Sequence, residues 1–169
     1  RVTLNWYRAE PSEGDYRWSR SDRLLNALRA RGLEPVVTLW GTPGWANAEN
    51  APNVAPLRGE DFQRFAFAAA ERYPFVSKWI MWNEPNKPTW LRPASARTYV
   101  SRILNPGYLG IKAANRRARV AGGVTGPVTW YRATGGLLQK CAFMGDEKHG
   151  FWQRWTASGV LIDEGEFDH

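Results

Sequence analysis

The sequence contains very few of the residues from which disulfides and metal sites are built. Its single cysteine, Cys141, excludes a disulfide within the chain, and its two histidines, His149 and His169, do not have the spacing of a zinc site. It also lacks an apolar run near the roughly 20 residues that a membrane-spanning helix requires. We therefore predict a protein that uses no metal or other cofactor and has no segment within a membrane.

The excess of charge of one sign is modest. The 169 residues include 23 Lys and Arg against 16 Asp and Glu, which gives a net charge of +7. The basic residues are scattered, and the densest group, Arg116, Arg117 and Arg119, ends a predicted helix, where positive charge offsets the helix dipole. We therefore expect no nucleic-acid partner. The chain is long enough to fold around one sizeable core.

Both ends of the chain interrupt a pattern. The sequence opens at Arg1, directly before an alternating run, without an initiator methionine or a basic-then-apolar signal segment. It stops at His169, where a polar stretch has just become apolar again. We expect residues 1–169 to be one partial domain cut from a larger one; the alternative is ordinary trimming around a complete fold.

Short β-type runs alternate with helix-type stretches. The runs cover residues 2–6, 35–40, 76–82 and 118–124, and helices are predicted to begin near Ser19, Glu60 and Ser95. The third helix should be interrupted at Pro106, which has no amide hydrogen to donate. Residues 126–147 give no clear pattern. We expect a short helix over 151–158, followed by a strand or a connector at 160–162.

This alternation predicts an α/β fold with a parallel sheet and right-handed crossovers. No glycine-rich fingerprint follows the first run, which disfavours a doubly wound nucleotide-binding sheet. Instead, aromatic or polar residues end the predicted strands: Trp6, Trp40, Asn83 with Glu84, and Thr125. Functional groups at the carboxyl ends of strands are typical of the (β/α)₈ TIM barrel, which takes about 250 residues. We therefore predict about half of a TIM barrel.

Half of a barrel has two strand edges without a neighbour, here near residues 2–6 and 118–124. Unpaired edges backed by apolar faces favour association with other chains, so we expect this chain to self-associate. Some residues should face the barrel interior and lose the opposite half of their packing: Leu4, Val36, Thr38, Ile80 and Trp82.

The most informative segment is residues 78–86, KWIMWNEPN. Strand alternation would place Ile80, Trp82 and Glu84 on one face. A carboxyl that ends an apolar strand beside an indole is poorly hydrated, so its pKa should rise and it could donate a proton near neutral pH. The alternative is that Glu84 caps the following loop or pairs with an arginine such as Arg92.

The stretch WNEPN at residues 82–86 resembles the acid/base motif of clan A glycoside hydrolases, the retaining enzymes built on (β/α)₈ barrels. Residues 5–18, with NW, EP and GDYRW, resemble the second barrel strand and its loop in family 39-like and family 5-like (cellulase-like) members. Residues 38–45 resemble the third strand and its loop, and residues 119–123 resemble the fifth strand. The resemblance covers about residues 1–125 and implies barrel strands two to five.

The resemblance implies retaining hydrolysis of an O-glycosidic bond in a β-linked carbohydrate. Glu84 would protonate the leaving oxygen and then activate a water as a base. Asn83 would bind the sugar 2-hydroxyl, provided that the strand bends there, because alternation points it away from Glu84. Retention needs a second carboxylate about 5–5.5 Å from the first, and in the family it ends the seventh strand, which this chain does not reach. We interpret Asp163, Glu164 and Glu166 as solvated surface charge.

Tryptophan is abundant, with ten in the chain, and its positions fit a sugar site. A pyranose ring can lay its apolar C–H face on an indole. Six tryptophans follow predicted strand ends: Trp6, Trp40, Trp45, Trp82, Trp90 and Trp130. We expect Trp6, Trp40 and Trp82 to bind substrate, and the other four, Trp18, Trp79, Trp152 and Trp155, to lie in the core. The alternative function is a catalytically inactive, carbohydrate-binding barrel. Secretion by a bacterium is what the family suggests for localisation.

Overall fold

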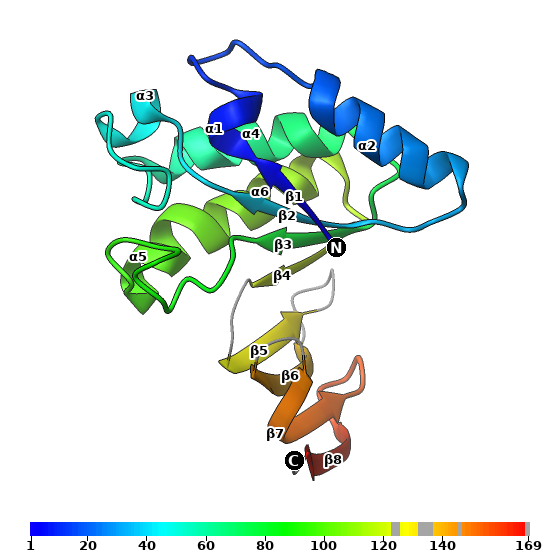
Figure 1. Ribbon diagram of the computed structural model, residues 1–169. Coiled ribbons are helices and arrows are strands. Elements are labelled where there is room, and N and C mark those ends of the chain that lie inside the picture. Colours follow the sequence, from blue (N-terminus) through cyan, green and yellow to red (C-terminus); the bar gives the residue numbers. More distant parts are fainter. Residues whose placement is uncertain (123–125, 132–136, 145–146, 168–169) are drawn as a thin grey trace.

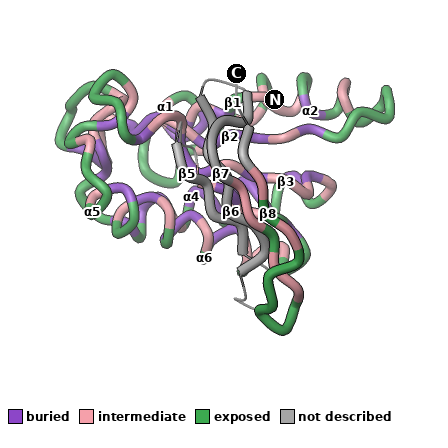
Figure 2. Tube along the Cα trace, turned by 90° about the horizontal axis from the view of Figure 1, so that it is seen from below, coloured by how far each residue is buried: buried purple, intermediate pink, exposed green. Residues whose placement is uncertain are grey.

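Two four-stranded sheets organise the chain in the computed structural model (Figure 1). The structure describes residues 1–122, 126–131, 137–144 and 147–167. The first sheet is parallel, in the order β1-β2-β3-β4, and the second is an antiparallel meander, β5-β6-β7-β8. Helices cover one face of the first sheet, and the second sheet lies on the side away from them (Figures 1 and 2). Within the described ranges, no helix combines the length and apolarity that crossing a membrane requires.

The parallel sheet has the predicted alternation of strand and helix. Its strands are β1 (Val2–Asn5), β2 (Val36–Trp40), β3 (Lys78–Met81) and β4 (Arg119–Gly122). The longer helices are α2 (Ser19–Ala30), α4 (Gly59–Arg72) and α6 (Asn105–Ala114). The shorter ones are α1 (Trp6–Ala9), α3 (Gly44–Asn47) and α5 (Ala96–Tyr99), and a π-helical turn, η1, covers Val100–Leu104. The prediction of a mixed α/β fold with a parallel sheet is thus confirmed.

Helix α4 packs as its periodicity predicts. Its apolar stripe, Phe62, Phe65, Ala66 and Ala69, is buried in the core between the helices and the sheet. In α2, Leu25 is fully buried, whereas the neighbouring Leu24 is 46% exposed. Helix α2 begins at Ser19, as predicted, and follows Trp18, whose side chain makes no cap hydrogen bond.

The predicted interruption at Pro106 is wrong. Helix α5, η1 and α6 follow one another without a gap, and the Asn105 amide donates to the Val100 carbonyl across the π turn. This wider turn ends just before Pro106, whose ring needs room and whose nitrogen has no hydrogen to donate. The segment therefore accommodates proline by widening one turn rather than by breaking the helix.

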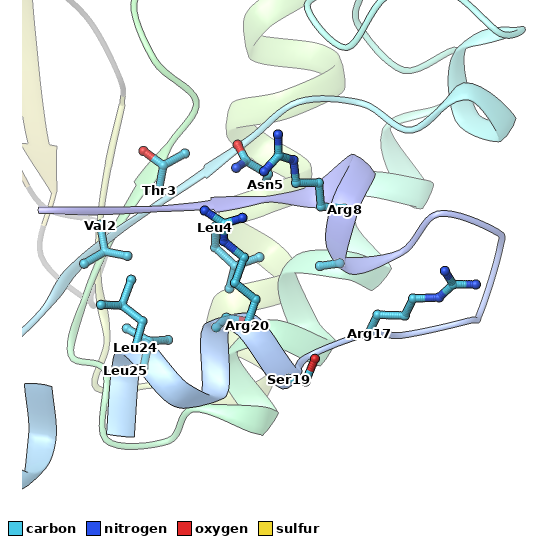
Figure 3. Close-up of a pocket in the computed structure, with 12 residues that line it drawn as sticks. Val2, Thr3, Leu4, Asn5, Arg8, Arg17, Ser19, Arg20, Leu24 and Leu25 are labelled. Carbon is cyan, nitrogen blue, oxygen red and sulfur yellow. The ribbon is translucent and has the colours of Figure 1, made fainter. Parts of the chain in front are cut away.

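The parallel register decides which strand residues face the helices. Leu4 pairs with Leu39, which pairs with Met81, and all three are buried in the core with the helices. Figure 3 shows Val2 and Leu4 pointing from β1 toward α2, whereas Thr3 and Asn5 point to the other side. The prediction that Leu4 faces the interior of a barrel together with Thr38 is therefore wrong, since Thr38 pairs with Thr3.

The last third of the chain does not continue the strand–helix alternation. Its strands are β5 (Gly126–Tyr131), β6 (Leu137–Met144), β7 (Glu147–Trp155) and β8 (Leu161–Phe167). The helix predicted over residues 151–158 is wrong, because most of it lies in β7; the strand alternative at 160–162 is confirmed from Leu161 onward. Trp152 lies over its cross-strand partner Gly165, where an added Cβ would come within 2.7 Å of the indole nitrogen. Thr125 lies outside the described residues.

Candidate active site

The turn that follows β3 has an unusual backbone. The strand ends at Met81, and both Trp82, with φ 74°, and Glu84, with φ 38°, adopt the left-handed region. Such conformations are strained for residues other than glycine and tend to occur at functional sites. The surroundings fix the turn: the Trp82 amide donates to Leu39 over 2.9 Å, and the buried Tyr99 hydroxyl donates to the Met81 carbonyl over 2.8 Å.

Glu84 lies within this turn at the carboxyl end of β3. Its side chain is 23% exposed, and its Oε1 forms an ion pair of 2.8 Å with Nζ of Lys87, which is 51% exposed. The Lys87 amide donates to the Glu84 carbonyl over 2.9 Å, which closes the turn. The cation beside Glu84 is therefore a lysine three residues ahead rather than the arginine, Arg92, considered from the sequence.

Asn83 is half-buried beside Glu84. Its Oδ1 accepts a hydrogen bond from Nη2 of Arg1, whose Nε also donates to the Thr38 hydroxyl over 3.0 Å. Since Asn83 sits in a turn with left-handed residues on both sides, strand alternation does not set its direction. The bend on which the predicted role of Asn83 depends is thus present.

The three tryptophans predicted to bind substrate differ in exposure. Trp40, at the end of β2, is half-buried, and its ring packs against Trp82 and Trp90 at centroid distances of 6.0 and 5.5 Å. Trp6 and Trp82 are both 0% exposed. A fully buried indole has no face on which a sugar can stack, so the stacking role predicted for Trp6 and Trp82 does not fit the structure.

Tyr7 has the exposure that was predicted for Trp6. Because α1 begins at Trp6, that ring turns into the core, and the next residue remains half-buried, with its ring edge-to-face on Trp40 at 6.0 Å. The sequence feature that could have indicated Tyr7 is the adjacent pair Trp6-Tyr7 directly after β1, because two neighbouring residues at this position do not both point into the core. Trp45 and Trp90 are also half-buried. The side chain of Trp130 is not among those that the structure describes.

Two loops at this end of the sheet are fastened to each other. Val54, from the loop after β2, forms a parallel bridge with Arg92, from the loop after β3. The Arg92 backbone amide donates to the Asn53 carbonyl over 2.7 Å, and the Arg92 carbonyl accepts from the Ala55 amide over 2.9 Å. Nδ2 of the Asn53 side chain donates to the Thr89 carbonyl over 3.1 Å. These bonds hold Trp90 next to Trp40 and give the candidate site a rim of ordered loops.

Two carboxyls of β8, Asp163 and Glu164, have surface contacts. Asp163 pairs with Arg154 of β7, which holds the pKa of Asp163 below its ordinary value, and Glu164 accepts from Gln153 over 2.8 Å. These contacts are on the surface of the antiparallel sheet, which fits solvated charge. Glu166 is described only as part of β8.

A cavity of about 210 Å³ lies elsewhere, between β1 and α2 (Figure 3). Leu4, Leu24 and Leu25 line its apolar part, and Arg8 and Arg20 are among its polar lining residues. It follows the outer edge of β1 and is separate from the turn after β3. In the part of the chain whose side chains are described, no three His, Cys, Asp or Glu residues are grouped as a metal would require.

Comparison with solved structures shows what this geometry resembles. No protein-family model matches the chain, and no curated protein matches it. Its fold, however, is similar to that of glycoside hydrolases. More particularly, a family 39 glycoside hydrolase from the gut symbiont Bacteroides cellulosilyticus WH2 superposes with a TM-score of 0.55 at 20% identity, over 72% of this chain and 25% of its own.

Two further solved structures give the same result. A monomeric β-xylosidase from Caulobacter crescentus CB15 has a TM-score of 0.52 at 24% identity, over 62% of this chain and 24% of its own. A family 39 glycoside hydrolase enzyme from Xanthomonas axonopodis pv. citri has a TM-score of 0.53 at 18% identity, over 79% of this chain and 35% of its own. The predicted resemblance to family 39 glycoside hydrolases is thus confirmed at the level of fold, and the chain spans a quarter to about a third of these relatives.

Proposed function

We propose that the protein to which this chain belongs hydrolyses O-glycosidic bonds in a β-linked oligo- or polysaccharide or glycoside with retention of configuration. Residues 1–169 would form part of a TIM-barrel catalytic domain and contribute its acid/base residue, Glu84. The observation that carries the proposal is the position of Glu84: it lies in the strained and well-fixed turn that follows β3 of the parallel sheet, next to Asn83 and at the same sheet end as Trp40.

In this proposal Glu84 gives its proton to the glycosidic oxygen as the bond to the anomeric carbon breaks. A carboxylate from outside this chain forms the glycosyl-enzyme intermediate. Glu84 then takes a proton from water, whose oxygen attacks the anomeric carbon and releases that carboxylate. Donation requires the acid form of Glu84, so substrate must displace the Lys87 ammonium; the 51% exposure of Lys87 allows this movement. Asn83 would hold the sugar 2-hydroxyl.

The test is Glu84→Gln in the full-length protein. Loss of a general acid costs about 10²–10⁴-fold in rate, so kcat/KM for alkyl glycosides should fall by that factor while binding of the sugar remains. Glu49→Gln is the matched control, because Glu49 is an exposed carboxyl that also has a positive φ, 60°, in the neighbouring loop. Normal hydrolysis of unactivated glycosides by Glu84→Gln would contradict the proposal.

A second candidate, an inactive carbohydrate-binding barrel, is favoured by the ion pair between Glu84 and Lys87, which gives the carboxylate a structural use. In that case wild type and Glu84→Gln would bind the same sugars with the same affinity, and neither would hydrolyse them. Under the first proposal the full-length wild-type protein hydrolyses these sugars. Residues 1–169 alone are expected to show no turnover, since the second carboxylate is supplied from outside this chain.

A further inference from the structure

An open cavity of about 390 Å³ lies on the helix-covered side of the molecule. Tyr16 and Trp18, from the segment between α1 and α2, line it together with three residues from the end of α4: Ala68, Glu71 and Arg72. In Figure 1 the end of α4 and α2 lie toward the right, whereas α1, α3 and α5, which follow the carboxyl ends of the strands, lie toward the left. The cavity is therefore remote from Glu84, and its size is in the range that holds small ligands.

The aromatic wall of this cavity is fixed before any ligand arrives. The rings of Tyr16 and Trp18 are stacked, with centroids 5.1 Å apart and planes 11° apart. Trp18 is stacked in turn on Phe65 of α4 at 6.0 Å and meets the edge of Tyr73 at 5.9 Å. The Tyr16 hydroxyl hydrogen-bonds the buried Glu10 carboxyl, and burial together with that charge raises the pKa of Tyr16 to about 12, so it remains a donor at neutral pH.

The polar side of the cavity is also ordered. Asp22 of α2 accepts two hydrogen bonds from Arg72, 3.2 Å from Nε and 2.8 Å from Nη2. The guanidinium is thus held in place, and a ligand that uses its remaining donors has less side-chain entropy to lose. Glu71 is exposed next to it and offers an acceptor.

We propose that this cavity is a second carbohydrate site, which holds a segment of a neutral polysaccharide away from the catalytic centre. The apolar C–H face of a sugar ring would pack on Tyr16, the outer ring of the stack, and meet the edge of Trp18, whose two faces are covered by Tyr16 and Phe65. The sugar hydroxyls would bond with Glu71 and Arg72. A nucleotide could also stack on these rings, but Asp22 already neutralises Arg72 and Glu71 would repel a phosphate. The open form of the cavity suits the middle of a chain rather than its end.

That the ligand is the polymer which the enzyme cleaves rests on the proposed function. The existence of the cavity does not depend on that function. The test is therefore made in full-length protein carrying Glu84→Gln, which prevents cleavage. Native electrophoresis through gels that contain soluble xylan, soluble mixed-linkage β-glucan or polygalacturonate measures binding as retardation. We expect retardation by at least one of the two neutral polymers and none by polygalacturonate.

Two added substitutions locate the binding. Tyr16→Ala removes the outer ring and Glu71→Ala removes the exposed acceptor, and each should weaken retardation by about tenfold. Tyr16→Phe keeps the ring, and Glu60→Ala changes an exposed glutamate at the other end of α4; both should bind like the parent. Because Tyr16→Ala could disturb the Glu10 contacts, Glu71→Ala on the exposed helix surface is the decisive variant.

The results separate the two proposals. In the protein with Glu84 intact, Glu71→Ala should leave kcat/KM for a short aryl glycoside unchanged and lower turnover of the polymer severalfold. An unretarded parent, or parent-like retardation of Glu71→Ala, would overturn the second site. A retarded parent with sensitive variants, in a protein that cleaves no glycoside, would leave the second site standing and remove the proposed hydrolase activity.

Discussion

The indole nitrogen of Trp6 donates a hydrogen bond of 2.7 Å to Oε2 of Glu10, and both side chains are almost completely buried, at 0% and 3% exposure. The Gly14 amide donates to the other carboxyl oxygen over 2.9 Å, and Gly14 has a φ of 78°, which glycine adopts without strain. Glu10 thus ties α1 to the turn that leads to Tyr16. Burial is the largest influence on this carboxyl and raises its pKa, although its three donors act in the opposite direction.

The raised pKa of Glu10 gives stability a definite pH dependence. A carboxyl whose pKa is higher in the folded state binds its proton more tightly there, so its contribution is greatest below the unfolded value of 4.5 and declines as pH rises through the folded value. Glu10→Gln cannot titrate. We therefore expect the free energy of unfolding of wild type, minus that of Glu10→Gln, to decrease from pH 4 to pH 7 in urea titrations. A difference that grows with pH would contradict this assignment.

The contact between α2 and α4 should have the opposite pH dependence. Arg72 and the Tyr73 hydroxyl both donate to Asp22 and hold its pKa below the ordinary value of 3.8. A lowered carboxyl pKa stabilises the fold above the unfolded value, and that contribution disappears as pH falls through the folded value. Because Arg72 is half-exposed, Asp22→Asn should cost only about 0.5–1 kcal/mol at pH 7, and the difference from wild type in thermal melts should become smaller as the pH is lowered from 7 toward 2.

Asp15→Asn is the control for this experiment. Asp15 pairs with Arg17 in an exposed position, with side-chain exposures of 50% and 65%. A solvated pair of this kind contributes little, so the variant should melt like wild type at both pH values. Equal effects of Asp15→Asn and Asp22→Asn would show that the contact between α2 and α4 has no special role.

Close packing of α6 on α4 leads to a prediction about stability. A Cβ at Gly110 would lie 2.3 Å from the Gln63 carbonyl oxygen and 2.9 Å from the Phe67 amide nitrogen, which are backbone atoms of α4. Gly110→Ala must therefore push two helices apart, at a cost of about 1–3 kcal/mol or more. Leu109→Ala, on the exposed side of the same helix, should change stability by less than about 0.5 kcal/mol. Differential scanning calorimetry of both variants checks this difference.

Local periodicity was sufficient to predict the parallel sheet and its helices, because a stripe such as Phe62, Phe65 and Ala69 depends only on spacing along one element. The direction in which Leu4 points depends on pairing with Leu39, a contact between distant residues. The strand at Trp152 likewise depends on a partner, Gly165, that leaves room for the indole. Periodicity within one segment does not contain such information.

In the candidate site, too, some features followed from the local sequence and others depended on contacts between distant residues. The position of Glu84 after β3 followed from the motif, and the structure places it in a turn at that strand end. The exposures of Trp6 and Trp82 did not follow, because they depend on where α1 begins and on how the turn after β3 bends. Tyr7 was missed for the same reason: α1 turns Trp6 inward and leaves Tyr7 beside Trp40.

These exposures make the aromatic residues separable in an experiment. Trp40 is half-buried at the carboxyl end of β2, so Trp40→Ala in the full-length protein should raise KM for a glycoside about tenfold by removing a ring from the site. Trp6→Phe keeps an aromatic ring in the core but removes one of the three hydrogen-bond donors to the buried Glu10, the indole N–H that bonds Oε2, which should cost about 1–3 kcal/mol of stability. Its kcat and KM, measured well below its melting temperature, should equal those of wild type. A raised KM in Trp6→Phe, with Trp40→Ala unchanged, would return Trp6 to the substrate site and remove Trp40 from it.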